Sequence, residues 1–117
     1  MHETSLINFT LDAVEKKAAQ MGITHVSDVR LIVGELKGAV PELLEYAFQI
    51  LAGSREMFEG AELDIELRPA VLKCRDCGRE FHAGLSDFAD AKCPSCGSAS
   101  REIIAGDELR IDSFSGE

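Results

Sequence analysis

Apolar residues recur at steps of three and four along the beginning of the chain. The residues with this spacing are Ile7, Leu11, Val14, Ala18 and Met21. Side chains three and four apart share one face of an α-helix, so the pattern predicts an amphipathic helix that ends at Gly22. Thr4 or Ser5 is expected to cap this helix, which would leave residues 1–3 just outside it, near its positive end.

Two strands and a second helix are expected to follow. Residues 29–33 alternate between the two faces of a strand that Gly34 closes, and residues 62–68 alternate strictly between charged and apolar side chains. Between these strands, Pro41 opens a helix that Gly53 ends, with one apolar face formed by Leu44, Ala47, Phe48 and Leu51. A helix between two strands favours parallel pairing of those strands.

The amino-acid composition of the chain changes after Pro69. Residues 71–102 contain all four cysteines and too few apolar side chains to form a core of their own. Alternation resumes at residues 108–112, which predicts a last strand that returns to the first sheet. The segment 71–102 is therefore expected to be a small module inserted near the end of the main domain.

Composition and charge narrow the classes of function. The chain has 117 residues, of which 45% are apolar and 28% charged, and this suits one compact domain with a small appendage. The net charge of −9 disfavours binding to nucleic acids and to anionic membranes, and it favours metal ions or basic proteins as partners. The most apolar stretch, residues 43–52, is far shorter than the ~18 residues of a membrane span. The polar, acidic start lacks the features of a secretory signal, so a cytoplasmic location is expected.

Two C-x-x-C pairs carry the strongest chemical signal. They are Cys74 with Cys77 and Cys93 with Cys96, separated by residues 78–92, and a glycine follows each pair. Two residues between ligands form a tight turn that points both sulfurs at one ion, and the glycine lets backbone N–H groups approach the thiolates. In a reducing cytosol a metal is favoured over disulfides. Because protein ligands fill all four positions, this pattern predicts a structural zinc site.

Other interpretations of the cysteines are weaker. A rubredoxin-like iron site would have a more aromatic surrounding than Phe81 and Phe88 provide, and a thioredoxin-like site needs a single pair. His82 is a candidate exchange ligand for zinc, although a surface histidine beside a filled site is the simpler interpretation. Residues 71–102 carry equal numbers of basic and acidic side chains, so they lack the basic face of a nucleic-acid-binding ribbon.

The amino terminus offers a second set of metal ligands. The α-amine of Met1, the amide nitrogen and imidazole of His2, and the amide or carboxylate of Glu3 can reach one ion. Nitrogen-rich planar sites suit Ni(II) or Cu(II), whereas zinc prefers the tetrahedron that sulfur already provides. Without further context, His2 can equally be a spacer residue.

An enzyme is the weakest class of function. No nucleophile motif surrounds the three histidines, and the four thiols are assigned to the metal. The glycines at 34 and 38 lack the spacing of a phosphate-binding loop. These features predict a protein that is not an enzyme, with a fold of two helices on a small mixed sheet of about three strands and an inserted zinc ribbon. The expected domains are residues 1–70 with 103–117, and residues 71–102.

Several short motifs, in their order and spacing, resemble the HypA/HybF family of hydrogenase maturation factors over essentially the full chain. They are Met1-His2-Glu3, Ser5-Leu6, Val33-Gly34-Glu35-Leu36, the segment from Phe58 to Leu63, the two cysteine pairs and Gly106-Asp107-Glu108-Leu109. The resemblance implies a metallochaperone that binds nickel through Met1, His2 and Glu3 and zinc through Cys74, Cys77, Cys93 and Cys96.

The same resemblance implies partners. They are a nickel-handling GTPase and the precursor of a [NiFe]-hydrogenase large subunit, to which the nickel is delivered. Some family members carry a histidine close to a cysteine pair, but Gly78 and Gly97 occupy those places in this chain. The alternative to nickel delivery is a zinc-ribbon adaptor that binds or regulates other proteins and handles no nickel.

Overall fold

A computed structural model describes residues 3–117 of the chain. It contains two compact units, each assembled from separate stretches of sequence. The α/β unit consists of the residues up to Ile32 together with Ala39–Glu66 and Arg110–Glu117. The ribbon unit consists of Val33–Gly38 and Leu67–Leu109. The division expected from the sequence, with residues 1–70 and 103–117 in one domain and residues 71–102 in the other, stays a prediction. Among the described residues, no helix combines the length and the hydropathy that crossing a membrane requires.

Helix α1 spans Glu3–Gln20 and begins earlier than the sequence pattern indicated. Glu3, Thr4 and Ser5 are all helical, so the prediction that Thr4 or Ser5 caps the helix from outside is wrong. Leu6 is buried together with Ile7, which extends the apolar face toward the amino terminus. The carboxylate of Glu3 in the first turn also stabilises the helix by interacting with its positive end.

The end of α1 follows the expected glycine signal. Gly22 has a φ of +75°, and the N–H of Ile23 donates to the carbonyl of Ala18 at 2.9 Å. The N–H of Gly22 donates to Ala19 at 3.2 Å, which completes a Schellman motif. Met21 lies beyond the last helical residue and is 59% exposed, so its assignment to the buried face is wrong.

Three strands form the sheet of the α/β unit, in the order β2-β1-β6. Their bounds are Val26–Gly34 for β1, Glu62–Arg68 for β2 and Leu109–Gly116 for β6. The N–H of Glu117 donates to His25 at 2.8 Å and the N–H of Gly34 donates to Glu108 at 2.7 Å, so β6 runs antiparallel to β1. The expected return of the last strand to the first sheet is confirmed.

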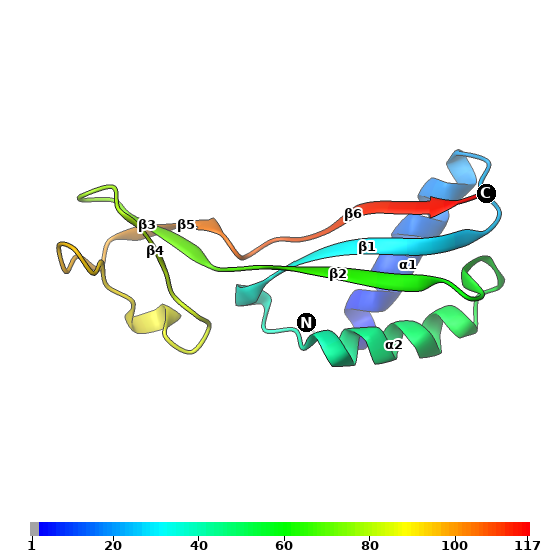
Figure 1. Cartoon of the computed structure of the whole chain (residues 1–117), viewed down its shortest axis with the longest axis horizontal. Helices are drawn as coiled ribbons and strands as arrows, with labels where there is room; N and C mark the ends of the chain where they lie inside the picture. Colours follow the sequence, from blue (N-terminus) through cyan, green and yellow to red (C-terminus); the bar gives the residue numbers. More distant parts are fainter. Residues whose placement is uncertain (1–2) are drawn as a thin grey trace. The chain divides into compact units, whose positions relative to one another are not determined.

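Helix α2, Pro41–Gly53, connects β1 to β2 after the short 3-10 helix η1, Glu35–Lys37. A further 3-10 turn, η2, covers Glu56–Phe58. Figure 1 shows β1 and β2 running in the same direction, so the expected parallel pairing is present and the sheet is mixed. Pro41 occupies the first turn of α2, where its missing N–H would have no helical partner in any case.

The apolar sides of α1, α2 and the sheet form the core of the α/β unit. Together with Phe58 of η2, the large buried side chains of these elements are Leu6, Ile7, Leu11, Val14, Val26, Val29, Leu31, Ile32, Leu44 and Phe48. Burying a side chain of this size contributes about 1.5–3 kcal/mol. On the exposed side of the sheet, Arg30 donates to Asp64 at 2.5 Å and to Glu66 at 2.7 Å, so a cation joins the acidic residues of β2 to β1.

The ribbon unit contains a second, antiparallel sheet in the order β4-β3-β5. Strand β3 is Val71–Cys74, β4 is Glu80–His82 and β5 is Arg101–Ala105, and a 3-10 turn, η3, covers Phe88–Asp90. The buried apolar residues described in this unit are Val33, Ala70, Leu72, Ala83 and two of the cysteines. Such a small set agrees with the expectation that this segment needs a further source of stability.

Two glycines permit three backbone segments of the ribbon unit to meet closely. A Cβ on Gly34 would lie 2.2 Å from the carbonyl oxygen of Gly106, and a Cβ on Gly106 would lie 2.3 Å from Cα of Ala70. Gly106 also has a φ of +101°, which side chains rarely allow. Both positions therefore require glycine because backbone atoms occupy the space of a side chain.

Candidate metal centre

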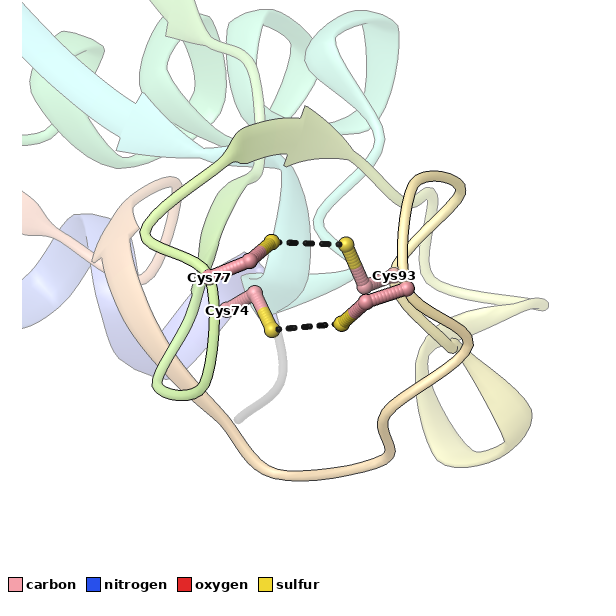
Figure 2. A group of neighbouring side chains, drawn as sticks. Cys74, Cys77 and Cys93 are labelled. Carbon is pink, nitrogen blue, oxygen red and sulfur yellow. Dashed lines mark hydrogen bonds between the residues drawn. The ribbon is translucent and has the colours of Figure 1, made fainter.

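The four cysteines come together in the ribbon unit. Cys74 ends β3, Cys77 follows in the adjoining turn, and Cys93 and Cys96 belong to the turn that precedes β5. The sulfurs of Cys74 and Cys96 are 3.5 Å apart, as are those of Cys77 and Cys93. All four sulfurs lie within 4.8 Å of one another, and Figure 2 shows them facing a common centre.

The two cysteine turns have the same backbone construction. In the first, the N–H of Gly78 donates to the carbonyl of Cys74 at 2.9 Å; in the second, Gly97 donates to Cys93 at 2.8 Å. Both glycines have φ values near the left-handed region, +79° and +75°. The positive φ lets the chain turn back after each pair, and residues with a Cβ rarely adopt it. The glycine after each pair, visible in the sequence, thus has the predicted structural role.

Side chains also connect the two turns to each other. Arg79 Nη1 donates to Ser95 Oγ at 2.6 Å, from the first turn to the second. In the opposite direction, Ser98 Oγ donates to a carboxylate oxygen of Asp76. These hydrogen bonds hold the turns face to face, which helps to keep the four sulfurs together. The sequence contained no signal for them, because each pair of partners is 16 or more residues apart.

Backbone hydrogen bonds favour the thiolate form of the first cysteine in each pair. The N–H of Cys77 lowers the pKa of Cys74, and the N–H of Cys96 lowers the pKa of Cys93 to about 6. At Cys96 the N–H of Ser98 lowers the pKa, but the neighbouring sulfurs of Cys74, Cys77 and Cys93 together with desolvation outweigh it and raise the pKa to about 12. Four like charges at this distance need a cation before all of them can ionise together.

The donor set fits a tetrahedral metal ion. Four sulfurs at the usual Zn–S length of about 2.3 Å form a tetrahedron with edges of about 3.8 Å. The separations of 3.5 Å are slightly shorter than that edge and no pair of sulfurs is more than 4.8 Å apart, so all are far beyond the roughly 2 Å of a disulfide bond. Cys74 and Cys93 are buried whereas Cys77 and Cys96 are exposed, so the cluster lies at the edge of the unit. Zinc, with its preference for thiolates in this geometry, is the metal that these residues fit best.

His82 lies apart from the cysteine cluster in this structure. Its Nε2 is 2.8 Å from Oε1 of Glu35, and the metal-ligating group found among the described residues contains cysteines alone. The backbone N–H of Ala70 donates to the same carboxylate oxygen at 2.9 Å. Sequence reasoning identified His82 but missed Glu35 as its partner, because the two residues are 47 positions apart.

The expected nickel ligands fall at the very start of the chain. Met1 and His2 lie outside the described residues. Glu3 begins α1 and is half-buried. Its place in the first helical turn differs from the expected position just outside the helix.

Comparison with known proteins identifies the family. A family model described as "Hydrogenase/urease nickel incorporation, metallochaperone, hypA" matches residues 1–116. The chain belongs to the HypA family. The HypA family's match thus includes the first residues of the chain as well as both cysteine pairs, and the resemblance noted from the short motifs is confirmed.

Two curated relatives match this chain over their full length. The chain is 39% identical over 117 residues to the hydrogenase maturation factor HypA of Moorella thermoacetica, with all of both chains covered. It is 39% identical over 121 residues to the hydrogenase maturation factor HybF of Klebsiella pneumoniae, again with both chains covered. Both relatives are named for hydrogenase maturation.

Solved structures of HypA share the fold. The solution structure of the nickel metallochaperone HypA from Helicobacter pylori matches with a TM-score of 0.70 and 26% identity, covering 99% of this chain and 97% of that one. A second HypA solution structure matches with a TM-score of 0.72 and 26% identity, covering 100% and 97%. The expected fold of two helices, a small mixed sheet and a cysteine-rich module is confirmed.

Proposed function

We propose that the protein binds Ni(II) at its amino terminus and delivers it for maturation of a [NiFe]-hydrogenase, while zinc in the four-cysteine site stabilises the ribbon. The observation that carries this proposal is the match of a nickel metallochaperone family to residues 1–116. Relatives of the same length, named as hydrogenase maturation factors, support the hydrogenase as the destination.

The proposed nickel ligands are Met1, His2 and Glu3. The α-amine, the amide nitrogen and the imidazole supply a nitrogen-rich set, and the Glu3 amide or carboxylate completes it. Nickel prefers such ligands in a planar arrangement. An α-amine and an imidazole also suit a metal that must leave again, because protons compete with the metal for these ligands near neutral pH.

Zinc has a different role at Cys74, Cys77, Cys93 and Cys96. Four thiolates occupy every position of the tetrahedron, which leaves none for a substrate or for water. When bound there, zinc supplies the neutralising charge that lets the four sulfurs ionise and the cross-link that the small ribbon core requires. The protein thereby separates two metals by ligand type and geometry, with sulfur for zinc and nitrogen for nickel.

The partners that we propose are a nickel-handling GTPase and the precursor of a [NiFe]-hydrogenase large subunit. The names of the relatives support a place in hydrogenase maturation. The net charge of −9 supports proteins, rather than nucleic acids, as the molecules that are bound.

A Ni(II) titration tests the proposal. The zinc-loaded protein with its native first residue is compared with His2→Ala and with a chain extended by a glycine before Met1, using calorimetry and absorption spectroscopy. His25→Gln is the matched control, because His25 is a histidine in the same unit whose ring contacts the carbonyl of Glu59. The native chain and the control are expected to bind nickel with a planar spectrum, and the other two chains are expected to lose it.

Equal binding by all four proteins would contradict the amino-terminal site. Absence of nickel binding in the native chain would favour the alternative, a zinc-ribbon adaptor that acts through protein contacts. Zinc content measured in the same samples shows whether any loss of nickel comes from damage to the ribbon.

A further inference from the structure

Helix α2 exposes an apolar stripe along one side. Leu43 is 49% exposed, Tyr46 64% and Ile50 55%, although all three are large apolar or aromatic side chains. Their spacing of three and four positions places them on one face over about two helical turns. The buried residues of α2, such as Leu44 and Phe48, form a different face. The exposed stripe is therefore additional to the face that forms the core.

This stripe borders a groove between α2 and the first turn of α1. The groove has a volume of about 510 Å³ and is lined by Leu43, Tyr46, Ala47, Ile50 and Leu51 of α2 and by Glu3, Thr4 and Ser5 of α1. We call it the α2 groove. Apolar atoms make up most of its walls. Contiguous exposed apolar surfaces of this kind commonly mark sites where another molecule binds.

The charges around the α2 groove have one sign. Glu3 is the charged residue among those that line it, Glu42 lies one helical turn before Tyr46, and α2 carries no lysine or arginine. The lysines of α1, Lys16 and Lys17, lie near the opposite end of that helix. An apolar groove with an acidic border is complementary to an apolar segment flanked by basic residues.

We propose that the α2 groove binds a basic amphipathic helix of a partner protein. Apolar side chains of that helix would contact Leu43, Tyr46 and Ile50, and flanking lysines or arginines would lie near Glu3 and Glu42. A second copy of this chain is disfavoured, because it would bring the same glutamates together and add a further net charge of −9.

The position of Glu3 connects this surface to nickel delivery. Glu3 lines the groove, and it is also a proposed nickel ligand, so a docked partner would lie beside the amino terminus. This connection rests on the proposed function, whereas the docking itself does not depend on nickel.

The experiment uses synthetic peptides of about 16 residues, long enough for four helical turns. The first peptide has leucines on one face and lysines on the flanks. The second has the same composition with the leucines spread around the helix, and the third has glutamates in place of the lysines. Binding to the zinc-loaded full chain is measured by calorimetry and by mapping of backbone amide shifts in NMR spectra. The first peptide is expected to bind at least 10-fold more tightly than the other two and to shift residues 3–5 and 43–51.

Variants of the protein locate the binding surface. Tyr46→Asp is expected to weaken binding of the first peptide at least 10-fold. An aromatic side chain that becomes buried when the partner binds often contributes most of the binding free energy. Met21→Asp is the matched control: Met21 is also exposed, at 59%, but it does not line the groove. Glu42→Lys is expected to weaken binding more at low salt than at high salt, with Glu80→Lys in the ribbon unit as its control.

Several outcomes would overturn the proposal. Equal losses in Tyr46→Asp and Met21→Asp, or equal binding of all three peptides, would show that no defined groove is used. A concentration-dependent dimer that Tyr46→Asp abolishes would show that a second copy occupies the surface. The nickel titration of Tyr46→Asp separates the two proposals, because loss of peptide binding with nickel retained concerns the groove alone.

Discussion

His82 Nε2 lies 2.8 Å from Oε1 of Glu35, and this contact joins strand β4 to the 3-10 turn that follows β1. Both residues belong to the ribbon unit. Glu35 also accepts a hydrogen bond from the N–H of Ala70. One carboxylate thus connects three segments of the chain, and the histidine that the sequence suggested as an exchange ligand has a carboxylate partner.

Acid is expected to weaken this connection. The N–H of Ala70, followed by His82, lowers the pKa of Glu35 from its ordinary value. A carboxyl whose pKa is lower in the folded state stabilises the fold above its unfolded pKa of about 4.3, and that contribution is lost as the pH falls through the folded value. Carboxyl NMR titration of the zinc-loaded protein should give Glu35 a lower midpoint than in the urea-unfolded chain. An equal or higher midpoint would show that these hydrogen bonds are not formed in solution.

Two glycine substitutions should differ sharply in their effect on stability. Gly34→Ala places a Cβ 2.2 Å from a backbone oxygen of Gly106, so the backbone must shift. We expect a loss of about 1–3 kcal/mol in the free energy of unfolding, the usual range for overpacking. Gly53→Ala is the control, since no atom lies within 4 Å of its added Cβ. Urea denaturation of both variants, with zinc bound, should show Gly53→Ala unchanged or slightly stabilised. A tolerated Gly34→Ala would contradict the close approach.

Removal of one cysteine should release the metal from the ribbon. Cys74→Ala leaves three sulfurs, and zinc affinity is expected to fall by more than about 100-fold, beyond the loss that follows from changing an outer hydrogen bond. The ribbon unit should then lose its fixed amide shifts because its buried apolar set is small. Zinc content by elemental analysis and NMR spectra measure both effects. Ser98→Ala, which removes the contact with Asp76 and no sulfur, should retain zinc.

If Cys74→Ala kept a full complement of zinc and an unchanged thermal transition, the assignment of four sulfur ligands would be wrong. Helical signals of the α/β unit are expected to persist in this variant, since its core residues belong to α1, α2 and the first sheet.

Mild acidification should release nickel before zinc. Ordinary pKa values are about 7.7–8.0 for an α-amine and about 6.5 for imidazole, so protons compete for the proposed nickel ligands just below neutral pH. At Cys93 the pKa is already lowered to about 6 without metal, and a bound cation favours the thiolate further. Dialysis between pH 7.5 and 5.5 with metal analysis should therefore show nickel loss with zinc retained. Release of both metals together would contradict this order.

Local patterns were sufficient for most of the fold. The three-and-four spacing of Ile7, Leu11 and Val14 predicted α1, because burial on one helical face imposes that period. Strict alternation predicted β2 at the residues where it occurs, 62–68. Proline and glycine marked the two ends of α2. The spacing of the cysteines likewise predicted the cluster, since two residues between ligands determine a turn almost regardless of the surrounding fold.

Contacts between distant residues were not predictable from those patterns. The spacing of apolar residues in α1 continued to Met21. The helix nevertheless ends at Gln20, the chain turns at Gly22, and the side chain of Met21 is exposed. Thr4 and Ser5 have the chemistry of a cap, yet burial of Leu6 and the favourable position of Glu3 extend the helix past them. The sequence around His82 does not indicate which of the acidic residues of the chain is its partner, because Glu35 lies 47 positions away.

The amino-acid sequence by itself determined the two helices, the three strands of the first sheet, the cysteine turns and the family, because each depends on residues within a few positions of one another or on their order along the chain. The tertiary structure alone decided that Gly34 and Gly106 must be glycines, that Glu35 meets His82, and that Leu43, Tyr46 and Ile50 remain uncovered. The physical reason is that these properties arise where separate segments approach in space. A hydrophobic period shows that a side chain can be buried, whereas only packing shows whether a neighbour covers it.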